Sequence, residues 1–165
     1  MTPRSNKVRV YDVQSDGWVD LPRTALAIRT SVHGVLLRGT SVLVIKSINR
    51  GRYDLPGGGI NPGESIAEAL CREFVEETGV EVSPFALLSV TEKFVKLNVS
   101  TPPWQVINII YLVEEVGGVI KPAGNGVDSF GATFVPFTDL DETNTIQGLG
   151  ILEAVNALCN QGGDA

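Results

Sequence analysis

Hydrophobic and polar positions along the chain follow two periods, which predict several strands and two helices. Runs with the alternation and β-branched content of strands occupy residues 27–39, 41–47, 80–95, 104–116 and 131–137. The run 104–116 is the most hydrophobic and is expected to be a central strand, whereas the run 80–95 is expected to be interrupted at Ser83-Pro84. Apolar residues at helical spacing over 144–159 predict a closing amphipathic helix. This order of elements favours an α/β sandwich.

The first predicted helix follows a loop rich in glycine and proline at residues 53–64. Ser65 and Glu68 have the spacing of a capping box at the start of a helix, and Gly79 is a natural terminator. The helical period puts one group of apolar side chains on the face expected to meet the core, namely Ala67, Leu70, Cys71, Phe74 and Val75.

Three carboxylates occupy a different side of this predicted helix. Glu73, Glu76 and Glu77 lie within two turns, with only Arg72 at the edge of their arc. Like charges at this spacing repel by roughly 0.2–0.5 kcal/mol per pair, and negative charge near a helix C-terminus opposes the macrodipole. A solvated charged face is the ordinary interpretation, but such faces usually alternate in sign. A site for a divalent cation is the alternative. It is favoured because the three carboxylates lie where both charge repulsion and the macrodipole disfavour them, and such departures tend to mark functional sites.

Oxygen ligands without sulfur or imidazole select hard cations such as Mg²⁺, Mn²⁺ or Ca²⁺. The only histidine, His33, lies in a strand pattern and is interpreted as structural. Mg²⁺ usually binds through a few carboxylates together with substrate phosphates. The helix therefore predicts a site that handles phosphate groups.

The loop and helix together carry a family resemblance. Residues 58–80, GGINPGESIAEALCREFVEETGV, resemble the signature GX5EX7REUXEEXGU of the Nudix hydrolases, in which U is a large apolar residue. The matching positions are Gly58, Glu64, Arg72, Glu73, Phe74, Glu76, Glu77, Gly79 and Val80. Phe74 is aromatic where an aliphatic residue is commoner, and Tyr53 stands where tryptophan is frequent.

The resemblance implies a Nudix-type α/β/α sandwich with a mixed β-sheet over residues 25–160. It also implies Mg²⁺-dependent hydrolysis, with Mn²⁺ as an alternative, of a pyrophosphate bond in a nucleoside diphosphate linked to another group. A nucleoside triphosphate or other small nucleotide, in a house-cleaning role, comes first among the substrates. An ADP-ribose or nucleotide-sugar pyrophosphatase comes second, and a non-catalytic nucleotide-binding regulator is the alternative outside enzymes.

The resemblance also assigns expected roles to individual residues. The metal ligands that it implies are Glu73, Glu76, Glu77 and the carbonyl of Gly57. The supporting residues are Gly58, Glu64 and Arg72. The general base is left open between the box glutamates Glu76 and Glu73 and the loop acid Asp128, which an ordinary turn aspartate would equally explain. Lys46 and Arg52 flank the glycine loop and are candidates for contacting substrate phosphates.

Composition and charge bear on the N-terminal segment, the partners and the cellular location of the protein. Residues 1–24 are polar and are expected to form an N-terminal arm or an edge hairpin. The net charge of −6 argues against broad binding to a nucleic-acid polymer or an anionic membrane. The two cysteines form neither a disulfide framework nor a zinc pattern. No apolar run approaches the ~20 residues of a membrane span, and residues 1–17 lack a signal-peptide pattern. A cytoplasmic protein is therefore expected. The expected partner is a small nucleotide, and a homodimer stays open.

Overall fold

The computed structural model describes residues 5–47, 51–121, 129–146 and 158. Asp128 and most of the predicted closing helix over 144–159 lie outside these residues. The nine strands are β1 Lys7–Asp12, β2 Gly17–Pro22, β3 Ala27–Arg38, β4 Ser41–Ser47, β5 Tyr53–Asp54, β6 Gly57–Gly59, β7 Val80–Lys96, β8 Trp104–Gly118 and β9 Ser129–Pro136. They are joined by the α-helix α1 Ile66–Thr78 and by short 3₁₀ turns at Arg23–Ala25 and Phe137–Asp139.

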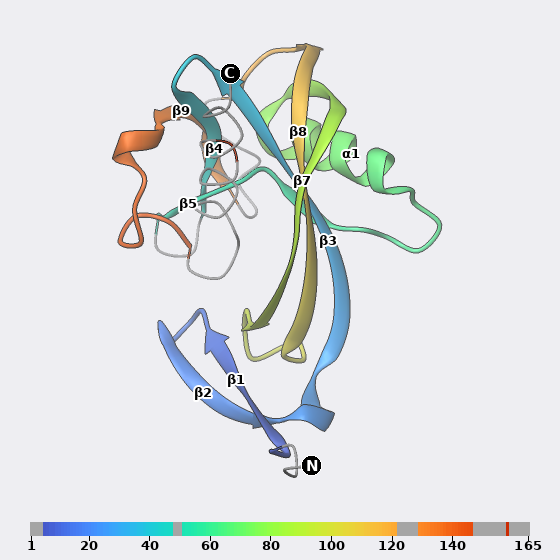
Figure 1. Ribbon diagram of the computed structural model, residues 1–165, viewed down its shortest axis with the longest axis vertical. Coiled ribbons are helices and arrows are strands. Elements are labelled where there is room, and N and C mark those ends of the chain that lie inside the picture. The colour runs from blue at the N-terminus through green and yellow to red at the C-terminus, as the bar shows by residue number, and fades with distance from the viewer. Residues whose placement is uncertain (1–4, 48–50, 122–128, 147–157, 159–165) are drawn as a thin grey trace.

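The strands form one mixed, curled sheet in the order β2-β1-β7-β8-β3-β4-β5, with β6 paired to β3 and β9 paired to β4. The pairs β1–β7 and β3–β8 are parallel, and the other pairs are antiparallel. In Figure 1, β7 and β8 arch through the centre, with α1 on one side and β4, β5 and β9 on the other. The predicted α/β fold with a mixed sheet is confirmed, and the second helical layer of the expected sandwich falls outside the described residues.

The five predicted strands are present, and the run 104–116 is central, because β8 lies between β7 and β3. The predicted break at Ser83-Pro84 is wrong, since β7 runs through it. The sheet absorbs the proline with a register shift between Pro84 and Ala86. A bulge of this kind tolerates a residue that has no N–H to donate.

Residues 7–22 of the polar N-terminus form a β-hairpin at one edge of the sheet. Asp16 supports its turn with a positive φ of 55°, a conformation that aspartate tolerates better than most residues. The hairpin joins the sheet where Tyr11 and Asp12 pair with Val95 and Lys96 at the end of β7. Figure 1 shows it at the end of the molecule opposite α1.

Helix α1 begins and ends where the sequence predicts. Ser65 Oγ accepts a hydrogen bond from the Glu68 N–H at 3.2 Å, and Glu68 Oε2 accepts one from the Ser65 N–H at 2.8 Å. Gly79, at φ 78°, ends the helix in the left-handed conformation. The buried side of α1 packs against β3 and β7. Its Leu70 and Phe74 belong to the same hydrophobic cluster as Val32 of β3 and Val82 of β7.

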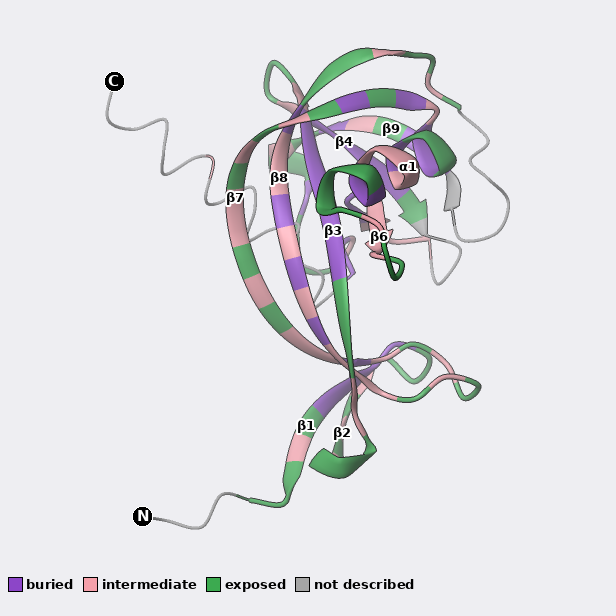
Figure 2. Cartoon of the chain, turned by 90° about the vertical axis from the view of Figure 1, so that its right-hand side faces the viewer, coloured by how far each residue is buried: buried purple, intermediate pink, exposed green. Residues whose placement is uncertain are grey.

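The predicted core face of α1 is partly wrong. Ala67 and Val75 are exposed, whereas Glu77 and Thr78 are buried. The helix is therefore rotated about its axis, relative to the orientation that the apolar residues alone predict, so that Glu77 and Thr78 face the protein interior. Figure 2 shows buried positions on one side of α1 and alternating along β8.

Candidate active site

Arg72 attaches the glycine loop to the helix. Its guanidinium contacts Glu64 through two bonds, Nε to Oε1 at 2.6 Å and Nη2 to Oε2 at 3.0 Å. The Nη2 group also donates to the carbonyl oxygen of Gly59 at 3.1 Å. The hydrogen bond from Arg72 is the largest cause that lowers the pKa of Glu64 to about 2. Glu64 is therefore a carboxylate at neutral pH, and the loop is held by a charge-assisted clamp.

Glycine is required where this loop meets its neighbours. Gly57 has a φ of 147°, and a Cβ there would overlap the backbone of Val32 and His33. A Cβ on Gly58 would overlap the carboxylate of Glu73. Strand β6 can therefore lie directly against both β3 and the acidic part of α1 only because these positions lack side chains.

The three box glutamates have different environments. Arg72 Nη1 contacts Glu73 Oε1 at 2.9 Å and Glu76 Oε2 at 3.4 Å, and the Glu76 side chain is 53% exposed. Glu77 is only 4% exposed, and its Oε2 accepts the N–H of Gly57 at 2.9 Å. The expected single acidic arc is therefore divided: Glu73 and Glu76 share an arginine, while Glu77 faces inward to the loop.

The donor chemistry of this region suits a hard cation, because it offers carboxylate and carbonyl oxygens. Within the described part of the chain, however, no group of three or more His, Cys, Asp or Glu side chains is arranged to hold a metal ion. Glu73 and Glu76 are directed to Arg72 instead. By type these residues fit Mg²⁺, and a shared ion would require them to turn from the arginine.

A pocket of about 190 Å³ extends from Glu77 along the concave part of the sheet. Among its lining residues are the buried polar side chains His33, Asp54 and Asn108, together with Trp104. This volume is many times the roughly 10–15 Å³ that a single water needs in a cavity. It can hold one ring system beside the carboxylate end of the helix.

Two buried titratable groups in this pocket were not predicted as site residues. Burial raises the pKa of Asp54 to about 7, although its Oδ1 accepts the Leu55 N–H at 2.8 Å. Burial lowers the pKa of His33 to about 4, so the imidazole is neutral and its Nδ1 faces the Leu55 carbonyl at 3.4 Å. The sequence signal for Asp54 was its position between the apolar residues Tyr53 and Leu55, at the start of the glycine- and proline-rich segment 53–64.

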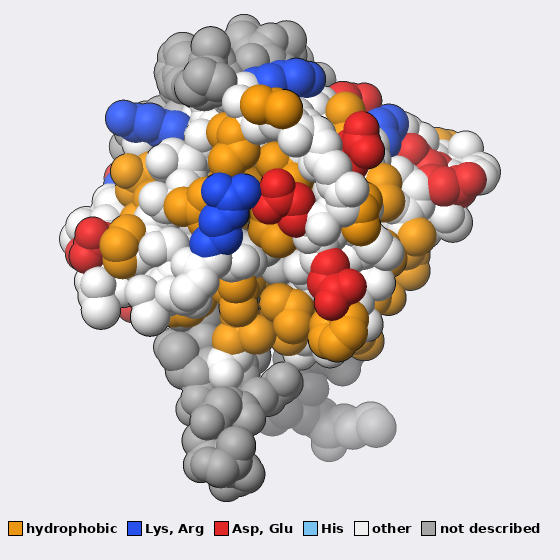
Figure 3. All heavy atoms as spheres, turned by 90° about the horizontal axis from the view of Figure 1, so that it is seen from above, with side chains coloured by type: hydrophobic (Ala, Val, Ile, Leu, Met, Phe, Trp, Pro, Cys, Tyr) orange, Lys and Arg blue, Asp and Glu red, His pale blue; other side chains and the backbone are white. Residues whose placement is uncertain are grey.

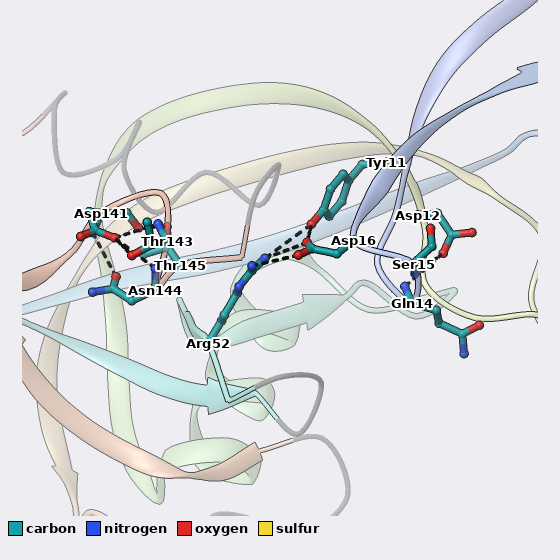
Figure 4. A network of polar contacts seen from close by, with 10 residues as sticks. All are labelled: Tyr11, Asp12, Gln14, Ser15, Asp16, Arg52, Asp141, Thr143, Asn144 and Thr145. Atoms are coloured by element: carbon teal, nitrogen blue, oxygen red, sulfur yellow. Dashed lines mark hydrogen bonds and ion pairs between the residues drawn. The ribbon is translucent and has the colours of Figure 1, made fainter.

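The two predicted phosphate-binding residues lie elsewhere than in the pocket lining. Arg52 donates to both carboxylate oxygens of Asp16, at 3.0 and 3.1 Å, and contacts the Tyr11 hydroxyl at 3.5 Å. Figure 4 shows this side chain reaching from the start of β5 to the N-terminal hairpin. Lys46 is exposed on β4, where its backbone pairs with Tyr53. Arg52 thus links the loop to the hairpin.

On the face in Figure 3, acidic and basic side chains are interspersed with hydrophobic ones. Of the helices that the structure describes, none has the length and apolar character needed to cross a membrane.

Comparison with known proteins agrees with this geometry. A family model described as NUDIX domain matches residues 27–153. The human 8-oxo-dGDP phosphatase NUDT18 is 37% identical over 92 residues, which cover 55% of this chain and 26% of that protein. An ADP-ribose pyrophosphatase of Methanocaldococcus jannaschii is 32% identical over 113 residues, covering 67% of this chain and 63% of that protein. The chain thus spans less than two thirds of these curated relatives.

Solved structures show the same fold at low sequence identity. An ADP-ribose pyrophosphatase from Streptococcus suis has a TM-score of 0.65 and 16% identity, covering 82% of this chain and 92% of its own. A MutT protein from Methanosarcina mazei Go1 has a TM-score of 0.65 and 19% identity, covering 84% and 98%. With the NUDIX domain matched over most of its length and the signature helix in place, this chain belongs to the Nudix family.

Proposed function

We propose that this protein hydrolyses a pyrophosphate bond in a small nucleotide, and that the reaction depends on Mg²⁺ or Mn²⁺. The observation that carries the proposal is the signature loop and helix, held together by Arg72 and Glu64 at the mouth of a ring-sized pocket. The relatives that share this region are named for 8-oxo-dGDP and ADP-ribose, and both compounds contain a pyrophosphate bond.

The residues that would hold the cation are Glu73, Glu76, Glu77 and the Gly57 carbonyl. A bound divalent cation would neutralise the phosphate charge and lower the pKa of an attacking water. Glu77 fixes the loop by accepting the Gly57 N–H, and both residues line the pocket. Arg72 contacts Glu73 and Glu76 and offsets part of their negative charge in the protein without substrate.

Glu76 is the candidate proton acceptor among the described residues. It is the most exposed of the three box glutamates and has the longest contact with Arg72. A carboxylate in that position can approach a water that attacks the phosphorus atom. Asp128, the alternative base, lies outside the described residues and stays a separate candidate.

Nucleoside tri- and diphosphates are the first substrate class that we propose. Human and Mycobacterium tuberculosis relatives are named for 8-oxo-dGDP and 8-oxo-dGTP, the latter at 42% identity over 60 residues. ADP-ribose is the second class, favoured by the alignment of 113 residues with the M. jannaschii protein.

A hydrolysis screen tests the function and ranks the substrates. Nucleoside di- and triphosphates, their 8-oxo-guanine forms, ADP-ribose and nucleotide sugars are incubated with the protein in Mg²⁺ or in EDTA, and products are separated by ion-exchange chromatography. We expect cleavage between phosphates in Mg²⁺ and none in EDTA. Binding without cleavage of any compound would instead favour the non-catalytic regulator.

A further inference from the structure

A row of polar side chains on three adjacent strands runs along the pocket. Asn108 on β8 lies opposite Ser31 of β3 and opposite Thr91 of β7 in the sheet register. Residues that face one another on adjacent strands lie on the same side of a sheet. Ser31 and Asn108 line the pocket, and Thr91 continues the row beyond it.

Asn108 has the strongest unmet requirement for hydrogen bonds in this row. The residue is fully buried at 0% exposure. Its amide oxygen and its amide nitrogen both have no hydrogen-bond partner within the described part of the chain. A buried polar group without a partner costs about 1–3 kcal/mol, and native proteins rarely retain one without a reason.

Trp104 gives a second, independent observation in the same pocket. Its indole N–H is buried and has no partner among the residues that the structure describes. The guanidinium of Arg29 lies 5.6 Å from the ring, so one side of the indole is covered. Asn108 and Trp104, which both line this cavity, therefore each have a side-chain N–H without a partner among the described residues.

We propose that Asn108 determines specificity by hydrogen-bonding the edge of a nucleobase bound in this pocket. A planar amide offers one donor beside one acceptor, and a nucleobase edge offers the complementary pair. The remaining lining includes Val13, Val95 and Val106, which suit the apolar faces of a ring. A phosphate or an amine would satisfy only one half of the amide.

The position of the pocket connects this role to the proposed chemistry, on which the inference rests. Glu77 and the glycines Gly57 and Gly58 line the same cavity as Asn108. A base over Asn108 would place its attached phosphates toward the signature helix. Asn108 would thus select the nucleotide without taking part in bond cleavage.

Purine riboside triphosphate tests this proposal because it lacks the exocyclic group of ATP or GTP. We measure kcat/KM for it and for the better of ATP and GTP. One good bidentate contact corresponds to a preference of about five- to a hundredfold. In wild type we expect the complete purine to be preferred by that factor, and in Asn108→Leu we expect the preference to fall to within about threefold.

Gln105→Leu is the matched control, because it also replaces an amide with leucine on β8. Gln105 lies on the other side of the strand, where its Nε2 donates to Glu92. It should keep the wild-type preference. If Asn108→Leu keeps that preference too, the amide is satisfied by water alone and the proposal is overturned.

Thermal unfolding separates selection of a base from a structural role. Replacing an unpartnered buried amide by an apolar group of similar volume should leave the midpoint equal to or above that of wild type. A marked decrease in both Asn108→Leu and Asn108→Val would show that Asn108 supports the fold and would contradict the proposal. If the leucine variant alone does not fold, Asn108→Val is used for the kinetic comparison, because valine favours strands.

Calorimetric titration with adenosine, guanosine and purine riboside, without metal, separates this proposal from the hydrolytic one. Tighter binding of a complete nucleoside by wild type, lost in Asn108→Leu, would support base recognition even if no nucleotide is cleaved. Equal binding of the three nucleosides by wild type, or an unchanged preference in the variant, would overturn it.

Discussion

At the scale of single residues, Asp54 and His33 respond to burial in the same pocket in opposite ways. Burial raises the pKa of Asp54 from 3.8 to about 7 and lowers that of His33 from 6.5 to about 4. Both shifts favour the neutral form, as expected where water is excluded. Because the unfolded chain ionises both groups normally, each shift makes stability depend on pH.

The sign differs between the two groups. Between pH 3.8 and 7 the folded state retains the Asp54 proton that the unfolded chain loses, so the free energy of unfolding falls as pH rises. Between pH 4 and 6.5 the unfolded chain protonates His33 and the folded state does not, so that contribution rises with pH. The two contributions oppose one another over most of the acidic range.

Replacing Asp54 by asparagine should therefore stabilise the protein most at high pH. The variant removes a carboxylate that is buried and ionised at pH 8, whereas at pH 5 the native carboxyl is already neutral. We expect the thermal midpoint of Asp54→Asn to exceed that of wild type at pH 8, with a smaller excess at pH 5. A constant difference at both pH values would show that Asp54 does not titrate in this range.

Arg72 should be sensitive to replacement by lysine. Lysine keeps the charge but cannot hold Glu64 through two bonds while also donating to Gly59. Partners that orient a metal site are typically worth 10–100-fold, so we expect a fall of that size in kcat/KM. Arg38→Lys is the control, because Arg38 makes an exposed pair with Glu115. Equal effects of the two variants would contradict a special role for Arg72.

At this scale, sequence spacing bears most directly on contacts within the signature loop and helix. The signature implied that Glu64 and Arg72 support the loop, and the structure shows them bonded to each other. Asp54 and Asn108 were not predicted as pocket residues. A single polar residue in an apolar segment does not indicate which strands will lie beside that segment in the sheet. The burial of both residues depends on the register of β8 with β3 and on the position of the glycine loop.

At the scale of elements, helix α1 depends on its capping box. Ser65→Ala removes the hydroxyl that accepts the Glu68 N–H. Such a replacement costs about 0.5–2 kcal/mol, so chemical denaturation should show a lower midpoint with an unchanged slope. Ser65→Asp should retain most of the stability because aspartate caps equally well. If both variants matched wild type, the cap would contribute nothing measurable.

The N-terminal hairpin should be held to the glycine loop by Arg52 and Asp16. Asp16→Asn keeps a residue that tolerates positive φ but removes the carboxylate from the paired guanidinium. We expect faster amide hydrogen exchange in β1 and β2, with exchange in the centre of β8 unchanged. Unchanged exchange in the hairpin would show that its pairing with β7 is sufficient.

Element boundaries were more predictable than the face that each element buries. Strand periodicity and the caps of α1 are local properties, and both were predicted from the sequence. The buried face of α1 is set by its partners: Thr78 Oγ1 donates to the Phe74 carbonyl at 2.6 Å, and Glu77 accepts the Gly57 N–H. Because these bonds satisfy their polar groups, Thr78 and Glu77 can be buried. Hydrophobicity alone predicts instead that Ala67 and Val75 are buried.

At the scale of the whole molecule, the buried residues form three hydrophobic clusters. One contains Leu70 and Phe74 of α1, a second contains Val44, Leu55 and Ile110, and a third contains Val95 and Val106 with residues of the N-terminal hairpin region. The glycines of the signature loop and Glu77 line the pocket together with residues of the third cluster. Fold and family could be predicted because the signature specifies both, whereas the pocket arises from strands distant in sequence and could not.

The dependence of hydrolysis on Mg²⁺ in wild type and in Glu76→Gln tests the central claim most directly. The substrate is the nucleotide cleaved fastest in the screen, and Glu81→Gln, which changes an exposed carboxylate beyond the helix, controls for net charge. We expect no turnover of wild type in EDTA, a fall of about 10²–10⁴-fold in Glu76→Gln, and a rate within about threefold of wild type in Glu81→Gln. Full activity in EDTA, or wild-type turnover in Glu76→Gln, would contradict the account.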